Sequence, residues 1–252
     1  MRWPTLLALW LLCHATLALA ATTTLTTVAQ DNSAPKFIST PDGTKGFCVD
    51  ALRAIERIAP NLRFTGLEHS EPPVRIEARL AAGSLDVACG RARNKTRAAY
   101  ALDLEPAMFH ARYTVAVRAD DPVDVSRLDD IRRLGAAGMI LGVHGLSVMT
   151  ELAAEGGLLI DDAAITPEAN LTKLLAGRGR FFIYRSPGLK TLVRKAGLEA
   201  KVRVLPAVIY TTPLYLVVSR QLSPALIQEL TRTVAELDRS GEFARIYERW
   251  SD

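Results

Sequence analysis

The sequence has little of what usually identifies a metal centre, a membrane protein or a nucleic-acid-binding protein. Its 252 residues include three cysteines and four histidines, and they form no CxxC or HExxH motif, so we predict neither a metal nor a cofactor. No apolar run after residue 20 approaches the ~18 residues that a membrane helix needs. The formal charge of +4 is too small an excess to indicate a nucleic-acid partner. A glycine-rich phosphate loop and a nucleophile paired with a base are also missing.

The first 20 residues have the parts of a cleavable secretion signal. Arg2 supplies a positive charge, residues 6–12 are apolar, and the stretch ends in the small-residue sequence Ala18-Leu19-Ala20. The apolar run is too short to span a bilayer. Cys13 does not follow a small residue, so we interpret it as part of the signal and not as a lipid-attachment site. These features predict a protein of the bacterial periplasm.

Removal of the signal leaves about 230 residues, enough for one large domain or for two lobes of ~100 residues each. It also leaves two cysteines, Cys48 and Cys89. An even number of cysteines in an oxidising compartment permits a disulfide. Cys48 opens a predicted helix and Cys89 ends a strand that can lie beside it, so a bridge is sterically feasible; two buried free thiols are the alternative.

Strands and helices alternate along the chain in two units. The first unit has predicted strands at 25–30, 61–66 and 85–89, predicted helices at 48–58 and 73–82, and a loop at 31–44. The second unit continues the alternation from a helix at 126–134 to a strand at 202–205, and a final helix begins after Ser223. This order is typical of parallel sheets with right-handed crossovers.

Two extended segments, at 111–118 and 210–220, cross between the units. We therefore expect an α/β clamshell whose lobes close around a ligand. Lobe 1 is predicted to comprise residues 21–115 and 212–252, and lobe 2 residues 116–211.

Guanidinium groups gather directly after the buried strand at 85–89. Arg91, Arg93, Lys95 and Arg97 follow Gly90 within eight positions. Ligands of open α/β sheets bind beyond the carboxyl ends of the strands, and arginine grips a carboxylate with two parallel hydrogen bonds. The pattern predicts an anion site, with a solvated basic loop as the alternative.

The order of elements and six local motifs resemble the family 3 periplasmic solute-binding proteins, which deliver amino acids and similar compounds to ABC importers. The motifs lie at residues 46–50, 80–87, 94–97, 126–131, 142–147 and 240–250. The similarity spans nearly the whole chain after the signal. It implies a type II periplasmic-binding-protein clamshell with two hinge crossings.

The resemblance also implies roles for individual residues. Arg97 would clamp the α-carboxylate of the ligand, and the neighbouring strand end at Cys89 and Gly90 would offer backbone groups. Arg91, Arg93 and Arg185 are further candidates for neutralising the anion. Phe47 would line the floor of the cleft, or else pack in the core. Leu146 and Ser147 would present amide groups at a helix N-terminus, where an anion is favoured, although Ser147 can also be a plain N-cap.

The sequence departs from the family pattern at residue 185. An acid usually stands there to hold the ligand's α-ammonium group, whereas this chain has Tyr184 followed by Arg185. Because arginine repels an ammonium group, a ligand that meets Arg185 should carry a second acid or lack the amine. The alternative is that Arg185 faces solvent or pairs with Glu168. Tyr113 and Tyr210 are further candidates for lining the cleft, although tyrosines in strands are commonly structural.

The function that the resemblance implies is capture of a small anionic or zwitterionic solute, without chemistry, by a monomer that serves an ABC permease. One alternative is an enzyme on the same scaffold, similar to cyclohexadienyl dehydratase. Its general acid or base would come from His69, His110, His144, Glu71 or Glu105. Another alternative is a sensor subunit that binds a membrane histidine kinase.

Overall fold

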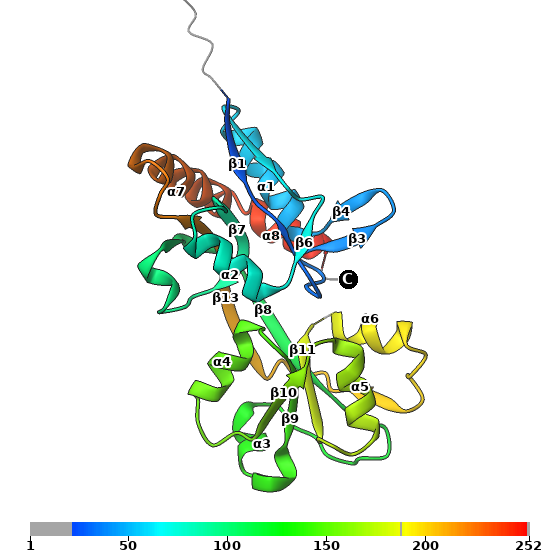
Figure 1. Cartoon of the computed structure of the whole chain (residues 1–252). Coiled ribbons are helices and arrows are strands. Elements are labelled where there is room, and N and C mark those ends of the chain that lie inside the picture. The colour runs from blue at the N-terminus through cyan, green and yellow to red at the C-terminus, as the bar shows by residue number, and fades with distance from the viewer. Residues whose placement is uncertain (1–21, 187, 251–252) are drawn as a thin grey trace, which may run out of the picture.

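The computed structural model describes residues 22–186 and 188–250. Figure 1 shows two lobes, one above the other, joined by two long strands, β8 (Ala101–Arg118) and β13 (Tyr210–Ser219). The predicted signal, residues 1–20, lies outside the described residues. Within the described residues, no helix has both the length and the apolarity needed to cross a bilayer.

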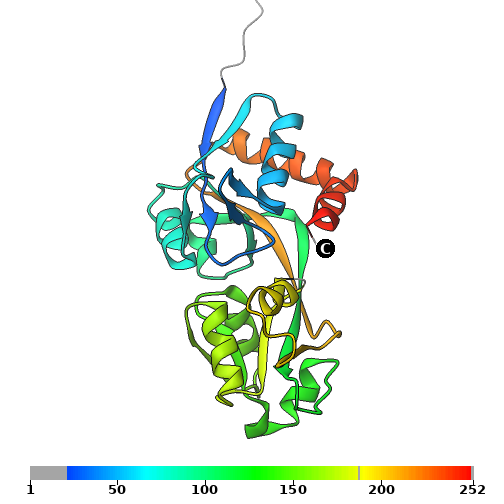
Figure 2. The same ribbon diagram turned by 90° about the vertical axis from the view of Figure 1, so that its right-hand side faces the viewer.

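Lobe 1 contains the first seven strands, two helices that lie between them in the sequence, a short 3-10 helix and the two C-terminal helices. Its strands are β1 (Thr23–Thr26), β2 (Ala29–Gln30), β3 (Ile38–Thr40), β4 (Gly43–Lys45), β5 (Leu62–Thr65), β6 (Ser70–Glu71) and β7 (Val87–Ala92). Its helices are α1 (Phe47–Ile58), α2 (Pro73–Ala81), the short 3-10 helix Arg97–Ala99, α7 (Pro224–Arg239) and α8 (Glu242–Arg249). In both views α1, α7 and α8 lie together on one side of lobe 1 (Figures 1 and 2).

Lobe 2 repeats the strand and helix alternation. Its elements are α3 (Leu128–Arg132), the 3-10 helix Gly135–Gly138, β9 (Ile140–Val143), α4 (Ser147–Ala154), β10 (Ile160–Ala164), α5 (Pro167–Leu175), β11 (Phe181–Arg185), α6 (Gly188–Lys195) and β12 (Val202–Val204). Helix α5 begins as its sequence predicts, because the Thr166 hydroxyl accepts a hydrogen bond from the Ala169 amide and Pro167 occupies the first turn.

One seven-stranded sheet runs through both lobes in the order β10-β9-β11-β8-β13-β7, with β12 also paired to β8. The pairs β9–β10 and β9–β11 are parallel, as are the separate pairs β1–β5 and β2–β6 of lobe 1. The long strands β8 and β13 pair antiparallel with each other, from Tyr210 opposite Tyr113 to Ser219 opposite Ala101. The predicted α/β clamshell with two crossings is the fold observed, and the crossings are these two paired strands.

Several elements differ from the sequence-based expectation. The predicted strand at 25–30 is divided into β1 and β2, which pair with different strands, β5 and β6. Strand β8 begins at Ala101, ten residues before the predicted crossing, because its first half pairs with β13 inside lobe 1. The predicted loop at 31–44 contains a small antiparallel hairpin, β3–β4. Its strands have three residues each, too few for the alternation of apolar and polar residues to be recognised.

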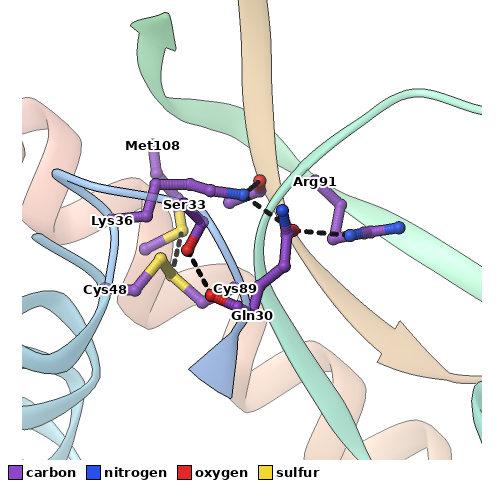
Figure 3. The surroundings of a disulfide bond; sticks show 8 residues. Gln30, Ser33, Lys36, Cys48, Cys89, Arg91 and Met108 are labelled. Atoms are coloured by element: carbon purple, nitrogen blue, oxygen red, sulfur yellow. Dashed lines mark hydrogen bonds between the residues drawn. A yellow bond between two sulfur atoms is a disulfide. The ribbon is translucent and has the colours of Figure 1, made fainter. Parts of the chain in front are cut away.

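A disulfide joins Cys48, in the first turn of α1, to Cys89 in β7. The two Cα atoms are 5.8 Å apart, and 41 positions separate the residues in the sequence. The bridge thus fixes the strand that delivers Gly90 and Arg91 to the edge of lobe 1. Figure 3 shows it directly beside the polar groups described next.

Candidate functional site

A small polar cavity lies between the lobes, with a volume of about 10 Å³. Lobe 1 and the crossing strands supply most of its wall, and lobe 2 supplies the turn before α4 and the end of β11. The lining residues are Gln30, Lys36, Gly90, Arg91, Tyr113, Gly145, Leu146, Arg185 and Leu214. The site therefore forms where strands β2, β9 and β11 end, as ligand sites of open α/β sheets do.

Lys36 and Arg91 are buried side by side in the lobe 1 wall. Both donate hydrogen bonds to Gln30 Oε1, Lys36 Nζ at 3.0 Å and Arg91 Nη1 at 2.7 Å (Figure 3). Lys36 Nζ also donates to the Gly90 carbonyl at 2.9 Å. Burial, and then the charges of Arg185, Arg91 and Arg97, hold the pKa of Lys36 well below its usual value. Among the described residues, buried Arg91 Nε has no hydrogen-bond partner.

Gly90 is required by this arrangement. Its φ is +68°, a conformation that residues with a side chain rarely adopt. A Cβ atom added there would lie 2.8 Å from Lys36 Cδ and 3.1 Å from Cys48 Sγ. The glycine therefore lets Lys36 cross the strand and reach the cavity.

Arg185 reaches from lobe 2 to the backbone of lobe 1. Its Nε donates to the Ala34 carbonyl at 3.1 Å and its Nη2 to the Asn32 carbonyl at 2.7 Å. The Tyr184 hydroxyl donates to the same Asn32 carbonyl at 2.9 Å. Arg185 is buried and lines the cavity, so the alternative in which it faces solvent or pairs with Glu168 is wrong. We call these three hydrogen bonds the interlobe latch.

The cavity carries positive charge without a compensating acid in its wall. Lys36, Arg91 and Arg185 line it, and no carboxylate of the described residues does, although Glu77 of α2 pairs with Arg91 from outside the wall. Asp121 is the only buried carboxylate in the described part of the chain, and it is paired elsewhere, with Arg180 at 2.8 Å. Tyr113 stays a neutral donor, since burial above all raises its pKa to about 12 although Arg185 acts in the opposite direction. Such a wall is suited to an anion.

Arg97, the predicted carboxylate clamp, does not line the cavity. Arg97 is only 2% exposed, and its guanidinium group is paired with a carboxylate of the protein itself. Nε and Nη2 donate to the two oxygens of Glu77, at 3.0 and 2.6 Å. Its Nη1 donates to the Ala92 carbonyl at 2.7 Å and to Asp103 at 3.4 Å. The prediction fails in this structure because Glu77 of α2, which sequence reasoning did not consider, takes the position that a ligand carboxylate would need.

The remaining predicted residues divide between cavity and core. Gly90, Arg91, Leu146, Tyr113 and Arg185 line the cavity. Phe47 does not, because it is buried in the lobe 1 core with its ring centroid 4.1 Å from that of Phe109. Tyr210 hydrogen-bonds Glu151 of α4 at 3.1 Å and is not part of the cavity wall. Tyr184 contributes through the latch, and Ser147 begins α4, with its side chain outside the described part of the structure.

Four cavity residues were not predicted: Gln30, Lys36, Gly145 and Leu214. Gln30 ends the predicted strand at 25–30, so the rule that ligands bind beyond strand ends would have found it. Lys36 stands in the segment read as a loop, where no pattern distinguishes it from a solvated lysine.

The candidate acids and bases of the enzyme alternative lie outside the cavity. None of His69, His110, His144, Glu71 and Glu105 lines it. His144 is exposed, with Nδ1 3.8 Å from Asp162 Oδ2. In residues 22–186 and 188–250 no group of histidine, cysteine, aspartate and glutamate side chains is arranged to hold a metal ion.

The family model for bacterial extracellular solute-binding proteins, family 3, matches residues 26–252. The chain belongs to this family. Comparison with curated proteins finds no match.

Solved structures of the same fold cover about nine-tenths of this family 3 protein. A histidine kinase sensor domain with similarity to periplasmic binding proteins is 20% identical, with a TM-score of 0.70 over 91% of this chain and 96% of its own. A probable amino-acid ABC transporter extracellular-binding protein from Bacillus subtilis is 15% identical, with a TM-score of 0.71 over 91% and 97%. An ancestral amino acid-binding protein, a precursor of cyclohexadienyl dehydratase, is 17% identical, with a TM-score of 0.66 over 91% and 96%. At these identities the similarity establishes the fold.

Proposed function

We propose that this family 3 protein is a periplasmic receptor for a small organic anion that lacks an α-ammonium group. The observation that carries the proposal is the interlobe cavity, which is lined by the buried basic side chains of Lys36, Arg91 and Arg185 and, among the described residues, by no carboxylate, although Glu77 pairs with Arg91 from outside the wall. An α-ammonium group there would meet Arg185 instead of an acid. A carboxylate, in contrast, would complete the hydrogen bonds of Arg91 and reduce the repulsion among the three cations.

Capture would take place by closure of the lobes about β8 and β13. We assign residues 21–115 and 212–252 to lobe 1 and residues 116–211 to lobe 2. Lys36 and Arg91 would bind the anion first, on lobe 1. Arg185 would then approach from lobe 2, together with the amide groups that precede α4, where the helix dipole also favours an anion. The interlobe latch would hold the closed form.

The receptor would serve an ABC importer and act without chemistry. The predicted export signal and the family support this role, and among the described residues no histidine, aspartate or glutamate lines the cavity. A role as a sensor for a histidine kinase uses the same binding step. Uptake of the identified ligand by cells without the gene distinguishes the two, because only loss of an importer receptor abolishes it.

The test is a calorimetric and thermal-shift screen of the purified protein against amino acids, dicarboxylates and keto acids. We expect carboxylates without an α-amino group to raise the melting temperature, and their bound form to be recovered unchanged. Lys36→Met should remove the effect, whereas Arg93→Ala, which changes an exposed arginine outside the cavity, should leave it. Binding of amino acids alone, or of no anion at all, would contradict the proposal.

A further inference from the structure

The cavity between the lobes is too small to hold a whole metabolite. A volume of about 10 Å³ matches the space that a single water molecule needs. It can therefore receive one oxygen of an acidic group, and the remainder of any organic anion must lie outside it. One of the neighbouring spaces must therefore receive the remainder of the anion.

A larger groove of about 320 Å³ opens next to the cavity, and the two share Gly145 and Leu146 in their walls. The groove is formed by both lobes. Lobe 1 contributes the start of α2, and lobe 2 contributes the turns that follow β9 and β10. Gly145 of lobe 2 approaches Pro73 of lobe 1, since a Cβ atom built on this glycine lies 4.0 Å from Pro73 Cβ. Closure of the lobes thus creates the groove and the cavity together.

The wall of the groove is mainly apolar. Val74 of lobe 1 is 64% exposed and Ile165 of lobe 2 is 72% exposed, so both present apolar surface to the groove. Pro72, Pro73, Val143 and Leu146 complete the apolar surface. The polar side chains at the groove include Asp31 and His144. An apolar surface that begins at a cationic cavity is complementary to an amphiphilic anion.

A second space of about 390 Å³ also borders the site, but it shares only Gln30 with the cavity. The segment from Asn32 to Ala34 forms part of its wall, and the interlobe latch binds Arg185 and Tyr184 to this segment. Asn32 also lines the groove, so the latch segment borders both spaces. The groove shares two wall residues with the cavity and the second space shares one, so the groove beside Leu146 is the neighbour on which the inference is built.

We infer that the ligand is a monocarboxylate with an aliphatic or aromatic body, one oxygen of its carboxylate in the cationic cavity and its apolar body in the groove between Val74 and Ile165. This inference rests on the proposed function and specifies its substrate class. Each methylene that enters the groove should strengthen binding by about three- to fourfold, because burial of one CH₂ contributes about 0.8 kcal/mol.

The experiment is titration calorimetry of the full chain with acetate, butanoate, hexanoate and octanoate, and with succinate and 6-aminohexanoate as polar counterparts. We expect affinity to increase along the aliphatic series and both polar counterparts to bind more weakly than hexanoate. Val74→Ser and Ile165→Ser should each weaken octanoate binding about tenfold and leave acetate binding unchanged. Both positions are exposed, so these variants should fold. Ile58→Ser, at an exposed apolar position at the end of α1, is the matched control and should change neither the octanoate affinity nor the acetate affinity.

The outcomes separate the two proposals. If affinity is independent of chain length, or if 6-aminohexanoate binds better than hexanoate because its ammonium group meets Asp31, the assignment of an apolar body is overturned and the anion receptor stands. If none of the carboxylates binds, the proposed function itself is overturned.

Discussion

Glu77 is predicted to be essential for stability, although it is a single carboxylate on the short helix α2. It accepts hydrogen bonds from the buried guanidinium groups of Arg91 and Arg97, and one from the Tyr100 hydroxyl at 3.1 Å. Replacement by glutamine keeps the shape and one acceptor oxygen but removes the negative charge. Two buried arginines then remain without this anion, which for buried pairs generally costs about 3–5 kcal/mol.

The shifted pKa of Glu77 gives a similar contribution to the free energy of unfolding and predicts that this contribution depends on pH. Burial alone would raise this pKa, but the hydrogen bond from Arg97 and the charges of Arg91 and Arg97 outweigh burial and lower it from 4.5 to about 2. That difference corresponds to about 3 kcal/mol, and solvent screening of the partly exposed carboxylate reduces it to about 2 kcal/mol. Since the folded-state pKa is depressed, the stabilisation is complete above pH 4.5 and is lost as the pH falls through 2. We therefore expect Glu77→Gln to destabilise the protein by about 3 kcal/mol at pH 7.

Urea unfolding of the wild type and of Glu77→Gln, at several pH values between 7 and 2.5, measures this difference. The matched control is Glu105→Gln, because Glu105 pairs with Arg93 at the surface, where both side chains are more than half exposed. The control should lose less than about 1 kcal/mol. A Glu77→Gln protein as stable as this control at pH 7, or a difference that does not shrink toward low pH, would refute the assignment of Glu77 as the internal counterion.

Three further predictions concern the lobe 1 wall. Replacing Cys48 and Cys89 together by alanine should lower the free energy of unfolding by about 4 kcal/mol in non-reducing urea titrations, since the bridge closes a loop of 41 positions; dithiothreitol should then no longer affect the variant. Gly90→Ala should lower the free energy of unfolding by about 1–3 kcal/mol and weaken anion binding, because the new Cβ atom would meet Lys36. If the variant binds anions as tightly as the wild type, the proposed site is wrong. At alkaline pH, anion binding should take up protons, as the anion raises the depressed pKa of Lys36; calorimetry in buffers of different ionisation enthalpy should detect this uptake in the wild type and not in Lys36→Met.

Much of the fold could be predicted from the sequence because its signals are local. Helix α1 is amphipathic, with Ala51, Leu52 and Ile55 buried on one face, and α7 begins where Ser223 accepts a hydrogen bond from the Leu226 amide. The pairing of β8 with β13 along both lobes depends on contacts between residues about 100 positions apart. No local pattern reports such contacts, which is why the start of β8 was placed too late.

The site could be predicted only in outline, for a related reason. The cluster after β7 indicates that guanidinium groups gather at one strand end, but it does not indicate which of them are neutralised. Glu77 pairs with both arginines in the structure, with Arg97 through both oxygens and with Arg91 through Oε1 alone, so that Arg91 keeps one unpaired donor, Nε. Glu77 comes from a different element, and its position depends on how α2 packs against the strands. A resemblance based on motifs predicts that Arg97 binds the ligand, but it does not show that Glu77 pairs with this arginine.

The balance of charges in the cavity explains why closure should depend on the ligand. The interlobe latch favours the closed form, since hydrogen bonds from a charged donor such as Arg185 contribute about 1.5–3 kcal/mol each. Closure also brings Arg185 toward buried Lys36 and Arg91, and this repulsion opposes it. An anion about 4 Å from a cation contributes about 4 kcal/mol at an effective dielectric constant of 20, before the cost of its own desolvation. A shift from 1% to 99% closed needs about 5.5 kcal/mol, so the proposed anion would have to contact at least two of the three basic side chains to drive closure.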